Sequence, residues 1–323
     1  MPQIPKTRPP KLPNFIVAGA PTSGTTSLYH YLRQHPQVFM CPIKEPTYFA
    51  AADILARDDL RPMLERQRPA LRAYLAGEPR RPEQVWVTEW DDYVQLFKNA
   101  RDETALGEAS VSYLWLPSAA PAIRARLPVA RLIFLLRDPT ERLFSAYLMS
   151  RAEHPNVSFR DWVGTAMNSA DDRRRRMPQS PTPIDGGLYA THLRRFLELF
   201  PREQVRIYLY EDYRADARAV LGDIFAFLGV DPIQPIDVSR RHNETVVPRF
   251  PAMDRLRHRI FGHAPLTAWL PAPVSRALRG FYNRGKGNFT MDPEDRQRVI
   301  DYYRDELLQA QDLISRDLAT WLR

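Results

Sequence analysis

The strongest constraint on the fold is a short apolar run that ends where a helix begins. Residues 131–136 read RLIFLL, too short for a confident helix and flanked by turn-forming residues, so we predict a buried parallel strand. Asp138, Pro139 and Glu141 follow as an N-cap, a first-turn proline and an acidic residue three positions past the cap. This pattern predicts a helix that runs to about residue 152.

The same succession of strand and helix occurs twice more. Residues 15–18 are apolar and lead through a glycine-bounded loop, 19–24, into apolar residues at helical spacing. Residues 205–210 predict a strand, and 215–228 predict a helix that ends at Gly229. Strands that alternate with helices predict an α/β protein with a central parallel sheet flanked by helices, the architecture of P-loop proteins.

The rest of the chain suggests how this domain is organised. Residues 1–13 are rich in proline and basic residues, so we predict an extended arm followed by one domain over 14–323. Within the domain we expect a helical insertion at about 50–105 and a helical carboxyl-terminal region at about 250–323. Residues 171–184 contain an arginine run together with prolines and serines, which predicts an exposed loop.

The composition narrows the class of protein. Hydrophobic residues make up 44% and charged residues 26% of the 323, as in globular proteins. No apolar run is long enough to span a membrane and no signal-peptide pattern opens the chain, so we expect a cytoplasmic protein without a transmembrane segment. Cys41 is the single cysteine and the histidines show no recognised ligand spacing, so we assign no metal. The net charge of +8 favours an anionic partner.

The loop after the first predicted strand carries a signal for anion binding. Gly19-x4-Gly24-Thr25-Thr26 brings backbone N–H groups and a helix amino end together. It resembles a P-loop, except that Thr25 stands where the Walker pattern has a lysine that reaches the terminal phosphates. ATP chemistry is therefore disfavoured, and a plain strand-to-helix turn remains an alternative for the loop alone.

A second signal lies at the carboxyl end of strand 131–136. Arg137 offers a planar guanidinium suited to two-pronged phosphate binding, and Ser145 adds a hydroxyl about two turns into the next helix. Parallel sheets bind their ligands at this edge. The alternative is that Asp138 is only a helix cap and Arg137 only a surface residue.

Taken together, these segments resemble the sulfotransferases that use 3′-phosphoadenosine 5′-phosphosulfate (PAPS). The stretch PTSGTTSLYHYLRQHP is similar to their 5′-phosphosulfate-binding loop, and LIFLLRDPTERLFSAY to their 3′-phosphate-binding strand and helix. The resemblance covers nearly the whole chain and continues in Lys44-Glu45-Pro46-x-Tyr48-Phe49, Gly107-Glu108-x-Ser110-x-x-Tyr113 and Gly187-x-Tyr189. The most similar branch is the bacterial group that resembles the heparan sulfate N- and 3-O-sulfotransferases.

The resemblance implies a role for each matching residue. Glu45 takes the place of the general base that removes the acceptor proton. Arg137 and Ser145 would hold the 3′-phosphate, and Lys286 with Gly287 resembles a loop that closes over the nucleotide, although a surface loop is an alternative there. The phosphosulfate would be held by Thr22, Ser23, Gly24, Thr25, Thr26 and Ser27.

The sequence indicates the residues that would contact the acceptor less specifically than those that would bind the nucleotide. Tyr189 and His192 lie one turn apart on a predicted amphipathic helix and are our candidates for facing the acceptor, with a polar surface stripe as the alternative for His192.

Two residues depart from the family pattern. Thr22 and Ala109 stand where relatives carry lysines, and the first of those lysines offsets the negative charge that grows on the leaving group. Such charge stabilisation is usually the largest catalytic contribution. Lys44 is the nearest candidate to replace that lysine, followed by Lys286 and an arginine of the insertion. Neighbours in an extended segment point to opposite sides, so the alternative is that Lys44 and Glu45 do not share a site.

We therefore expect an enzyme that moves the sulfuryl group of PAPS to a hydroxyl or amine and releases adenosine 3′,5′-bisphosphate. The acceptor would be a small molecule, lipid or glycan, with no nucleic acid partner. The acceptor's identity, the choice between O- and N-sulfation and the oligomeric state are left open. The alternatives are an ATP-dependent P-loop phosphotransferase and a non-catalytic nucleotide or polyanion binder, the latter motivated by Thr22 and Ala109.

Overall fold

The chain divides into two compact units. The computed structural model describes residues 11–82, 85–151, 156–176, 182–240, 246–248, 283–285 and 289–323. The first unit comprises Met1–Arg137, Arg173–Pro181 and Tyr189–His242, and the second comprises Asp138–Asp172, Thr182–Leu188 and Asn243–Arg323. Among the described residues, no helix is both long and apolar enough to cross a membrane.

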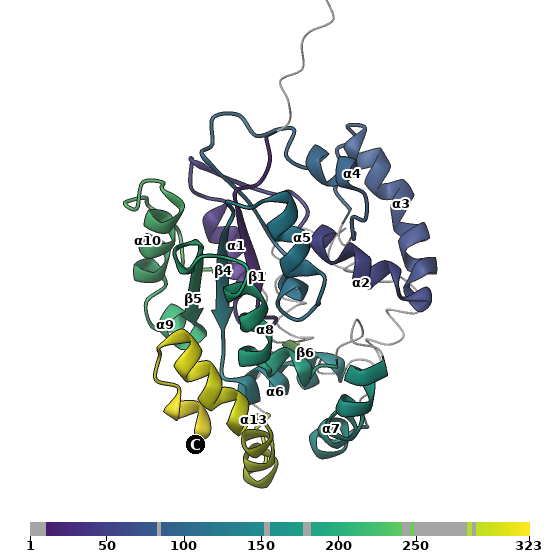
Figure 1. The fold of residues 1–323 in the computed structure, drawn as a ribbon, viewed down its shortest axis with the longest axis vertical. Coiled ribbons are helices and arrows are strands. Elements are labelled where there is room, and N and C mark those ends of the chain that lie inside the picture. The colour runs from purple at the N-terminus through teal and green to yellow at the C-terminus, as the bar shows by residue number, and fades with distance from the viewer. Residues whose placement is uncertain are drawn as a thin grey trace, which may run out of the picture. The chain divides into compact units, whose positions relative to one another are not determined.

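The first unit is built around a sheet whose described strands are all parallel. The strand order is β2-β3-β1-β4-β5 (Figure 1). Phe15 on the central strand β1 lies opposite Gly107 on β3 and Arg131 on β4. The strands are β1 (Phe15–Gly19), β2 (Val38–Met40), β3 (Ala105–Ala109), β4 (Arg131–Leu136) and β5 (Val205–Leu209). This sheet confirms the predicted α/β fold.

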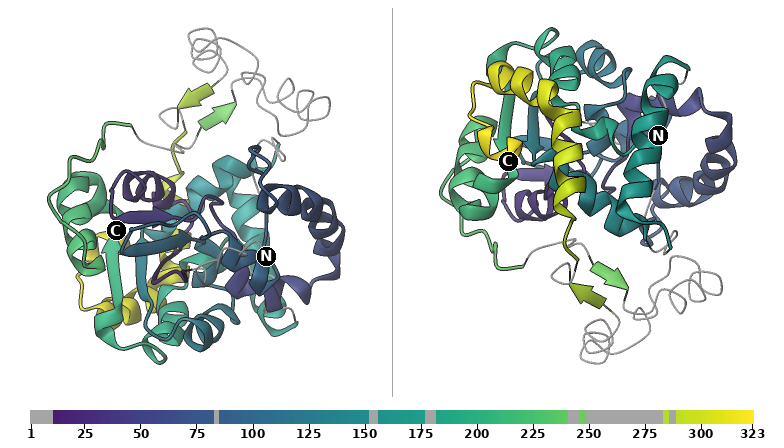
Figure 2. Two further views of the ribbon diagram at one scale, coloured as in Figure 1. Left: turned by 90° about the horizontal axis from the view of Figure 1, so that it is seen from above. Right: turned by 90° about the horizontal axis from the view of Figure 1, so that it is seen from below.

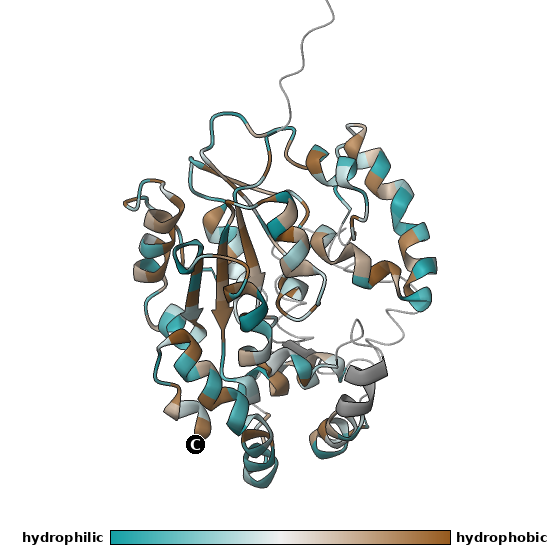
Figure 3. Ribbon diagram, viewed as in Figure 1, coloured by the Kyte–Doolittle hydropathy of each residue, from teal (hydrophilic) through white to brown (hydrophobic). Residues whose placement is uncertain are grey.

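Helices cover both faces of the sheet, which explains why most strand residues are apolar (Figure 3). On one face, Val17 and Leu135 belong to a buried cluster with α1 (Thr25–Leu32) and α10 (Ala217–Leu228). On the other, Phe134 meets Phe196 of α8 (Tyr189–Leu197) edge to face, with ring centroids 4.9 Å apart. As predicted, α10 ends at Gly229, which is left-handed.

Gly107 permits the tightest contact in this core. A Cβ atom at Gly107 would lie 2.2 Å from Cζ of Phe15 on the neighbouring strand, well inside van der Waals contact. Glycine in a strand interior normally weakens the strand, but here it leaves room for the aromatic ring. The missing side chain at Gly107 therefore lets the ring of Phe15 lie against β3.

The chain between β2 and β3 is largely helical, as predicted for about 50–105. Its longest helices lie together to one side of the sheet (Figure 1). The elements are η1 (Tyr48–Ala50), α2 (Ala51–Leu55), η2 (Asp58–Leu60), α3 (Arg61–Leu75) and α4 (Trp90–Gln95). The unit also contains η3 (Val111–Leu114), α5 (Ala119–Arg126), η5 (Arg202–Gln204) and α9 (Tyr210–Ala215).

The second unit begins with the helix predicted after strand 131–136. Asp138 caps α6 (Pro139–Ser150), because its Oδ1 accepts hydrogen bonds from the backbone N–H groups of Thr140 (2.8 Å) and Glu141 (3.3 Å). The other elements are most of α7 (Phe159–Arg176), η4 (Asp185–Gly187), the long helix α13 (Pro293–Ile314, yellow in Figure 2), η8 (Ala319–Leu322), and the antiparallel pair β6 (Val246–Pro248) and β7 (Asn283–Gly285).

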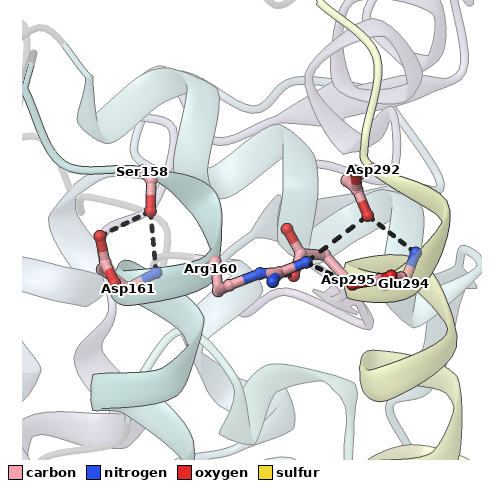
Figure 4. Close-up of polar contacts among 6 residues, drawn as sticks. All are labelled: Ser158, Arg160, Asp161, Asp292, Glu294 and Asp295. Carbon is pink, nitrogen blue, oxygen red and sulfur yellow. Dashed lines mark hydrogen bonds and ion pairs between the residues drawn. The ribbon is translucent and has the colours of Figure 1, made fainter.

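Arg160 joins α7 to the acidic start of α13 (Figure 4). Its Nε donates to Oδ1 of Asp295 at 2.6 Å, and its Nη2 donates to Oε2 of Glu294 at 3.1 Å. Asp292, whose Oδ1 lies 3.6 Å from the same Nη2, caps α13 by accepting from the backbone N–H of Glu294. Ion pairs of an exposed arginine are weak individually, so this cluster mainly specifies where α7 contacts the start of α13.

One secondary-structure prediction is wrong. Residues 171–184 were expected to form an exposed loop, but α7 continues through Arg176. Arginine is a good helix former, and the prolines that suggested a loop, Pro178, Pro181 and Pro183, all come after the helix has ended. In the predicted carboxyl-terminal helical region, β7 is a short strand, while residues 249–282 and 286–288 lie outside the described residues, as do residues 1–10 of the predicted arm.

Candidate functional site

The loop after β1 leads into the start of α1, whose N-cap residue makes no side-chain hydrogen bond to the helix. Gly24 is the N-cap residue with φ 87°, a left-handed conformation that favours glycine. A Cβ atom there would lie 3.0 Å from the ring of Tyr210, so the position is closed to larger residues. The first turn of α1 carries no acidic residue. A helix start of this kind is suited to binding an anion through backbone N–H groups.

The predicted loop residues differ in exposure. The backbone N–H of Ala20 donates to the carbonyl oxygen of Leu135 on β4 at 2.8 Å, which fixes the start of the loop. Thr22 is left-handed, with φ 55°. Ser23, Thr25 and Ser27 are buried, whereas Thr22, Gly24 and Thr26 are partly exposed.

Arg137 contacts this loop directly. Its Nη1 donates to the carbonyl oxygen of Thr22 at 2.9 Å, although the two residues are 115 positions apart. Its guanidinium lies over the ring of Tyr210, 5.1 Å from the ring centroid. The hydroxyl of Tyr189 donates to the carbonyl oxygen of Arg137 at 2.7 Å. The ends of β4 and β5 and the start of α8 thus position a guanidinium beside the anion-binding loop.

The structure does not test the remaining candidates for nucleotide binding. Ser145 is buried on α6, in the second unit. Lys286 and Gly287 lie outside the described residues. Their predicted roles stay predictions.

Lys44 and Glu45 form an ion pair, with Nζ of the lysine 2.7 Å from Oε1 of the glutamate. The segment is not extended, because Glu45 is left-handed with φ 63°. The two side chains therefore turn toward each other rather than to opposite sides. That Lys44 and Glu45 act in one catalytic site stays a prediction. Both side chains remain partly exposed, at 21% and 35%, so Glu45 is held beside a cation without being cut off from solvent.

The two residues that were predicted to face the sulfuryl acceptor, Tyr189 and His192, are buried. Tyr189 is fully buried, and its hydroxyl is bound to Arg137 as described above. Nδ1 of His192 accepts a hydrogen bond from Nη2 of Arg195 at 2.8 Å, since a guanidinium only donates. The same nitrogen of Arg195 donates to the carbonyl oxygens of Leu114 and Trp115. That these two residues contact an acceptor stays a prediction.

Glu108 is a buried carboxylate that the sequence reasoning did not select as a site residue. It is 0% exposed and accepts hydrogen bonds from Oγ of Ser110 (2.7 Å) and from the hydroxyls of Tyr113 (2.7 Å) and Tyr93 (3.2 Å). Burial raises the pKa of Glu108 to about 7, although these hydrogen bonds lower it, and the charge of Glu45 adds to the rise. The signal in the sequence was the spacing Glu108-x-Ser110-x-x-Tyr113 at the end of an apolar strand.

The raised pKa of Glu108 predicts that the protein loses stability as the pH rises from about 4.5 to about 7. The ordinary pKa of the side chain is 4.5, so over this range the folded protein holds a proton that the unfolded chain has lost. Stability therefore falls with rising pH, by an amount on the order of 3 kcal/mol. Urea unfolding of the wild type and of Glu108→Gln across this range checks the prediction, because the variant lacks the titrating group. Equal pH dependence in the two proteins would contradict it.

These groups gather at the carboxyl edge of the parallel sheet, where such sheets bind ligands. The loop follows β1, Arg137 follows β4 and Tyr210 follows β5, while the backbone N–H of Glu45 donates to the carbonyl oxygen of Ala109 at the end of β3. Within the described ranges, no group of three or more possible metal-ligating side chains occurs. A glycine-capped helix start, a guanidinium and a carboxylate paired with an ammonium thus lie at one edge, an arrangement that suits the binding and transfer of an anionic group.

The family follows from comparison with known proteins. Residues 13–235 match the model of the sulfotransferase family, and the chain belongs to this family. A solved structure with 28% sequence identity, the sulfotransferase from Alicyclobacillus acidocaldarius, superposes with a TM-score of 0.67 and covers 97% of this chain and 100% of its own. The resemblance inferred from the two motif segments is thereby confirmed, together with the sulfotransferase fold.

Among curated proteins, the chain is similar to human carbohydrate sulfotransferase 15, with 28% identity over 320 residues, 84% of this chain and 51% of that protein. It is also similar to human bifunctional heparan sulfate N-deacetylase/N-sulfotransferase 3, with 24% identity over 322 residues, 97% of this chain and 31% of that protein. The chain spans about half the length of the first of these relatives and a smaller part of the second.

Proposed function

We propose that this chain transfers the sulfuryl group of PAPS to a hydroxyl or amine of a small-molecule, lipid or glycan acceptor, with Glu45 as the general base. The contact between Arg137 and the loop after β1 carries the proposal. PAPS carries its 5′-phosphosulfate and its 3′-phosphate on the same ribose, so it requires two anion-binding groups that lie near each other. A loop of amides beside a guanidinium meets this requirement.

In this proposal each element has a separate task. The loop Thr22 to Ser27 binds the phosphosulfate, and the planar fork of Arg137 binds the 3′-phosphate, with Ser145 and the segment Lys286-Gly287 in the roles that the resemblance implies. Glu45 is placed to accept a proton from the acceptor because its carboxylate lies beside the ammonium of Lys44 and is partly exposed. PAPS supplies the sulfuryl group and leaves as adenosine 3′,5′-bisphosphate.

The comparisons favour a glycan among the possible acceptors. The names of the two human relatives refer to a carbohydrate and to heparan sulfate. The net charge of +8 on this chain suits an anionic glycan of that kind. A sulfated or carboxylated oligosaccharide is therefore the first acceptor to test.

Calorimetry tests the proposal against the phosphotransferase alternative. Adenosine 3′,5′-bisphosphate is expected to bind in the presence of excess EDTA, because the loop and Arg137 bind phosphate without a divalent cation. Binding of ATP that requires magnesium, without binding of the bisphosphate, would contradict the proposal.

A transfer assay with labelled PAPS and a panel of oligosaccharide, lipid and small-molecule acceptors tests catalysis itself. Product formation supports the proposal. Tight nucleotide binding without transfer to any acceptor would favour a non-catalytic nucleotide or polyanion binder.

A further inference from the structure

The segment Glu45–Phe49, here called the base segment, is held by the chain that immediately follows β3. Alternate backbone N–H groups of the base segment donate to acceptors in residues 109–113. The hydrogen bonds run from Glu45 to the carbonyl oxygen of Ala109 (2.9 Å), from Thr47 to Oγ of Ser110 (3.1 Å) and from Phe49 to the hydroxyl of Tyr113 (3.3 Å).

The base segment needs such support because its backbone is unfavourable on its own. Glu45 and Thr47 are both left-handed, with φ 63° and 57°. Residues with a Cβ rarely adopt this conformation, and a β-branched threonine does so least readily. Pro46, between them, has its carbonyl oxygen bound to the backbone N–H of Val87 at 2.8 Å. The position of the Glu45 carboxylate therefore depends on hydrogen bonds from outside the segment.

Glu108 determines which way the supporting hydroxyls point. The hydroxyls of Ser110 and Tyr113 each donate to a different carboxylate oxygen of Glu108, both at 2.7 Å. A hydroxyl has one hydrogen and accepts through its lone pairs, whereas Glu108, once it is ionised above its pKa of about 7, only accepts. With their hydrogens bound to Glu108, the oxygens are left to accept from the N–H groups of Thr47 and Phe49.

We propose that Glu108 is a positioning residue for sulfuryl transfer, which orients the hydroxyls of Ser110 and Tyr113 so that they hold the base segment and place Glu45. Glu108 acts through these residues, because it is fully buried on β3. The inference rests on the proposed function only in taking Glu45 as the base. The anchoring of the base segment stands on the hydrogen bonds alone.

Amide hydrogen exchange, followed by NMR, tests the anchoring without any activity. We expect Ser110→Ala to speed exchange of the Thr47 amide at least about tenfold, and Tyr113→Phe to do the same for Phe49, since each change removes the acceptor. Tyr93→Phe is the matched control, because the Tyr93 hydroxyl also donates to Glu108 but, among the described residues, accepts from no amide of the base segment. Exchange in that variant should stay at the wild-type rate.

Glu108→Gln tests the orienting role itself. The new amide group has two possible orientations. With its NH2 toward Ser110, only the hydroxyl hydrogen of Ser110 loses its acceptor. With its NH2 toward the tyrosines, the hydroxyl hydrogens of both Tyr93 and Tyr113 lose theirs, so the first orientation is expected. Exchange at Thr47 should therefore increase more than exchange at Phe49. Unchanged exchange at Thr47 in both Glu108→Gln and Ser110→Ala would overturn the inference.

Kinetics then connect the anchoring with the transfer reaction. In Ser110→Ala and Tyr113→Phe, kcat is expected to fall about 10- to 100-fold, because a small displacement of a catalytic group has effects of this size. The Kd for adenosine 3′,5′-bisphosphate should stay within about twofold of the wild-type value, since Ser110 and Tyr113 lie outside the loop that binds it. Losses no larger than in Tyr93→Phe would overturn the inference. A wild-type protein that transfers no sulfuryl group would instead refute the proposed function, and hydrogen exchange alone would decide the anchoring.

Discussion

Replacing Glu45 by glutamine is expected to lower kcat for sulfuryl transfer by about 10²–10⁴-fold, the usual contribution of a general base. Glutamine keeps the size of the side chain and an oxygen that can accept from Nζ of Lys44, which lies 2.7 Å from the carboxylate. It cannot take up the acceptor proton. Initial rates with labelled PAPS measure the loss, and calorimetry with adenosine 3′,5′-bisphosphate should show nearly unchanged affinity.

Glu89→Gln is a suitable control for this substitution. Glu89 is an exposed glutamate whose carboxylate lies 3.6 Å from Nη2 of Arg68, so it has a basic partner but lies outside the proposed site. Its replacement should leave kcat within about twofold, in line with the small effects of surface changes. Full transfer activity in Glu45→Gln would show that another group removes the proton.

Arg137→Ala is expected to weaken binding of adenosine 3′,5′-bisphosphate by roughly 30- to 1000-fold, or about 2–4 kcal/mol. The substitution removes charge-assisted, two-pronged hydrogen bonds to a phosphate. It also removes the hydrogen bond to the carbonyl oxygen of Thr22, which helps to shape the loop. Calorimetry in EDTA measures the change.

The same strand supplies a control at its other end. Arg131 begins β4, where its Nη1 donates to the carbonyl oxygen of Leu228 at 2.8 Å, so Arg131→Ala should cost some stability and leave nucleotide affinity unchanged. Arg137→Lys keeps the charge without the planar fork and should retain only part of the affinity. Equal affinities in Arg137→Ala and Arg131→Ala would remove Arg137 from the binding site.

The strands and their helices could be predicted because their signals are local. Residues 132–136 are apolar and buried on both faces, and the cap at Asp138 follows closely, so strand and helix are each specified by a few neighbouring residues. The proximity of Arg137 to the loop after β1 could also be predicted, since parallel strands present their carboxyl ends at one edge. The cytoplasmic location stays a prediction.

The features that were missed depend on contacts between distant parts of the chain. Glu108 is buried by Tyr93, which belongs to the helical segment between β2 and β3, and the sequence does not reveal that contact. The left-handed backbone of Glu45 could not be predicted from the sequence either, because position 45 is not a glycine. The conformation depends on a hydrogen bond to Ala109, which is distant in the sequence. Extended geometry was therefore assumed for Lys44 and Glu45, and their pairing was underestimated.

The pairing of Lys44 with Glu45 means that the local charge would change if Glu45 acted as a base. Before the reaction the two charges cancel, so a polyanionic donor meets no net repulsion at the carboxylate. Once Glu45 has taken a proton it is neutral, and the ammonium beside it is left with an uncompensated positive charge. In the proposed reaction the surroundings would thus become electropositive as negative charge accumulates on the departing nucleotide, in a chain that carries Thr22 where the family resemblance implies a lysine.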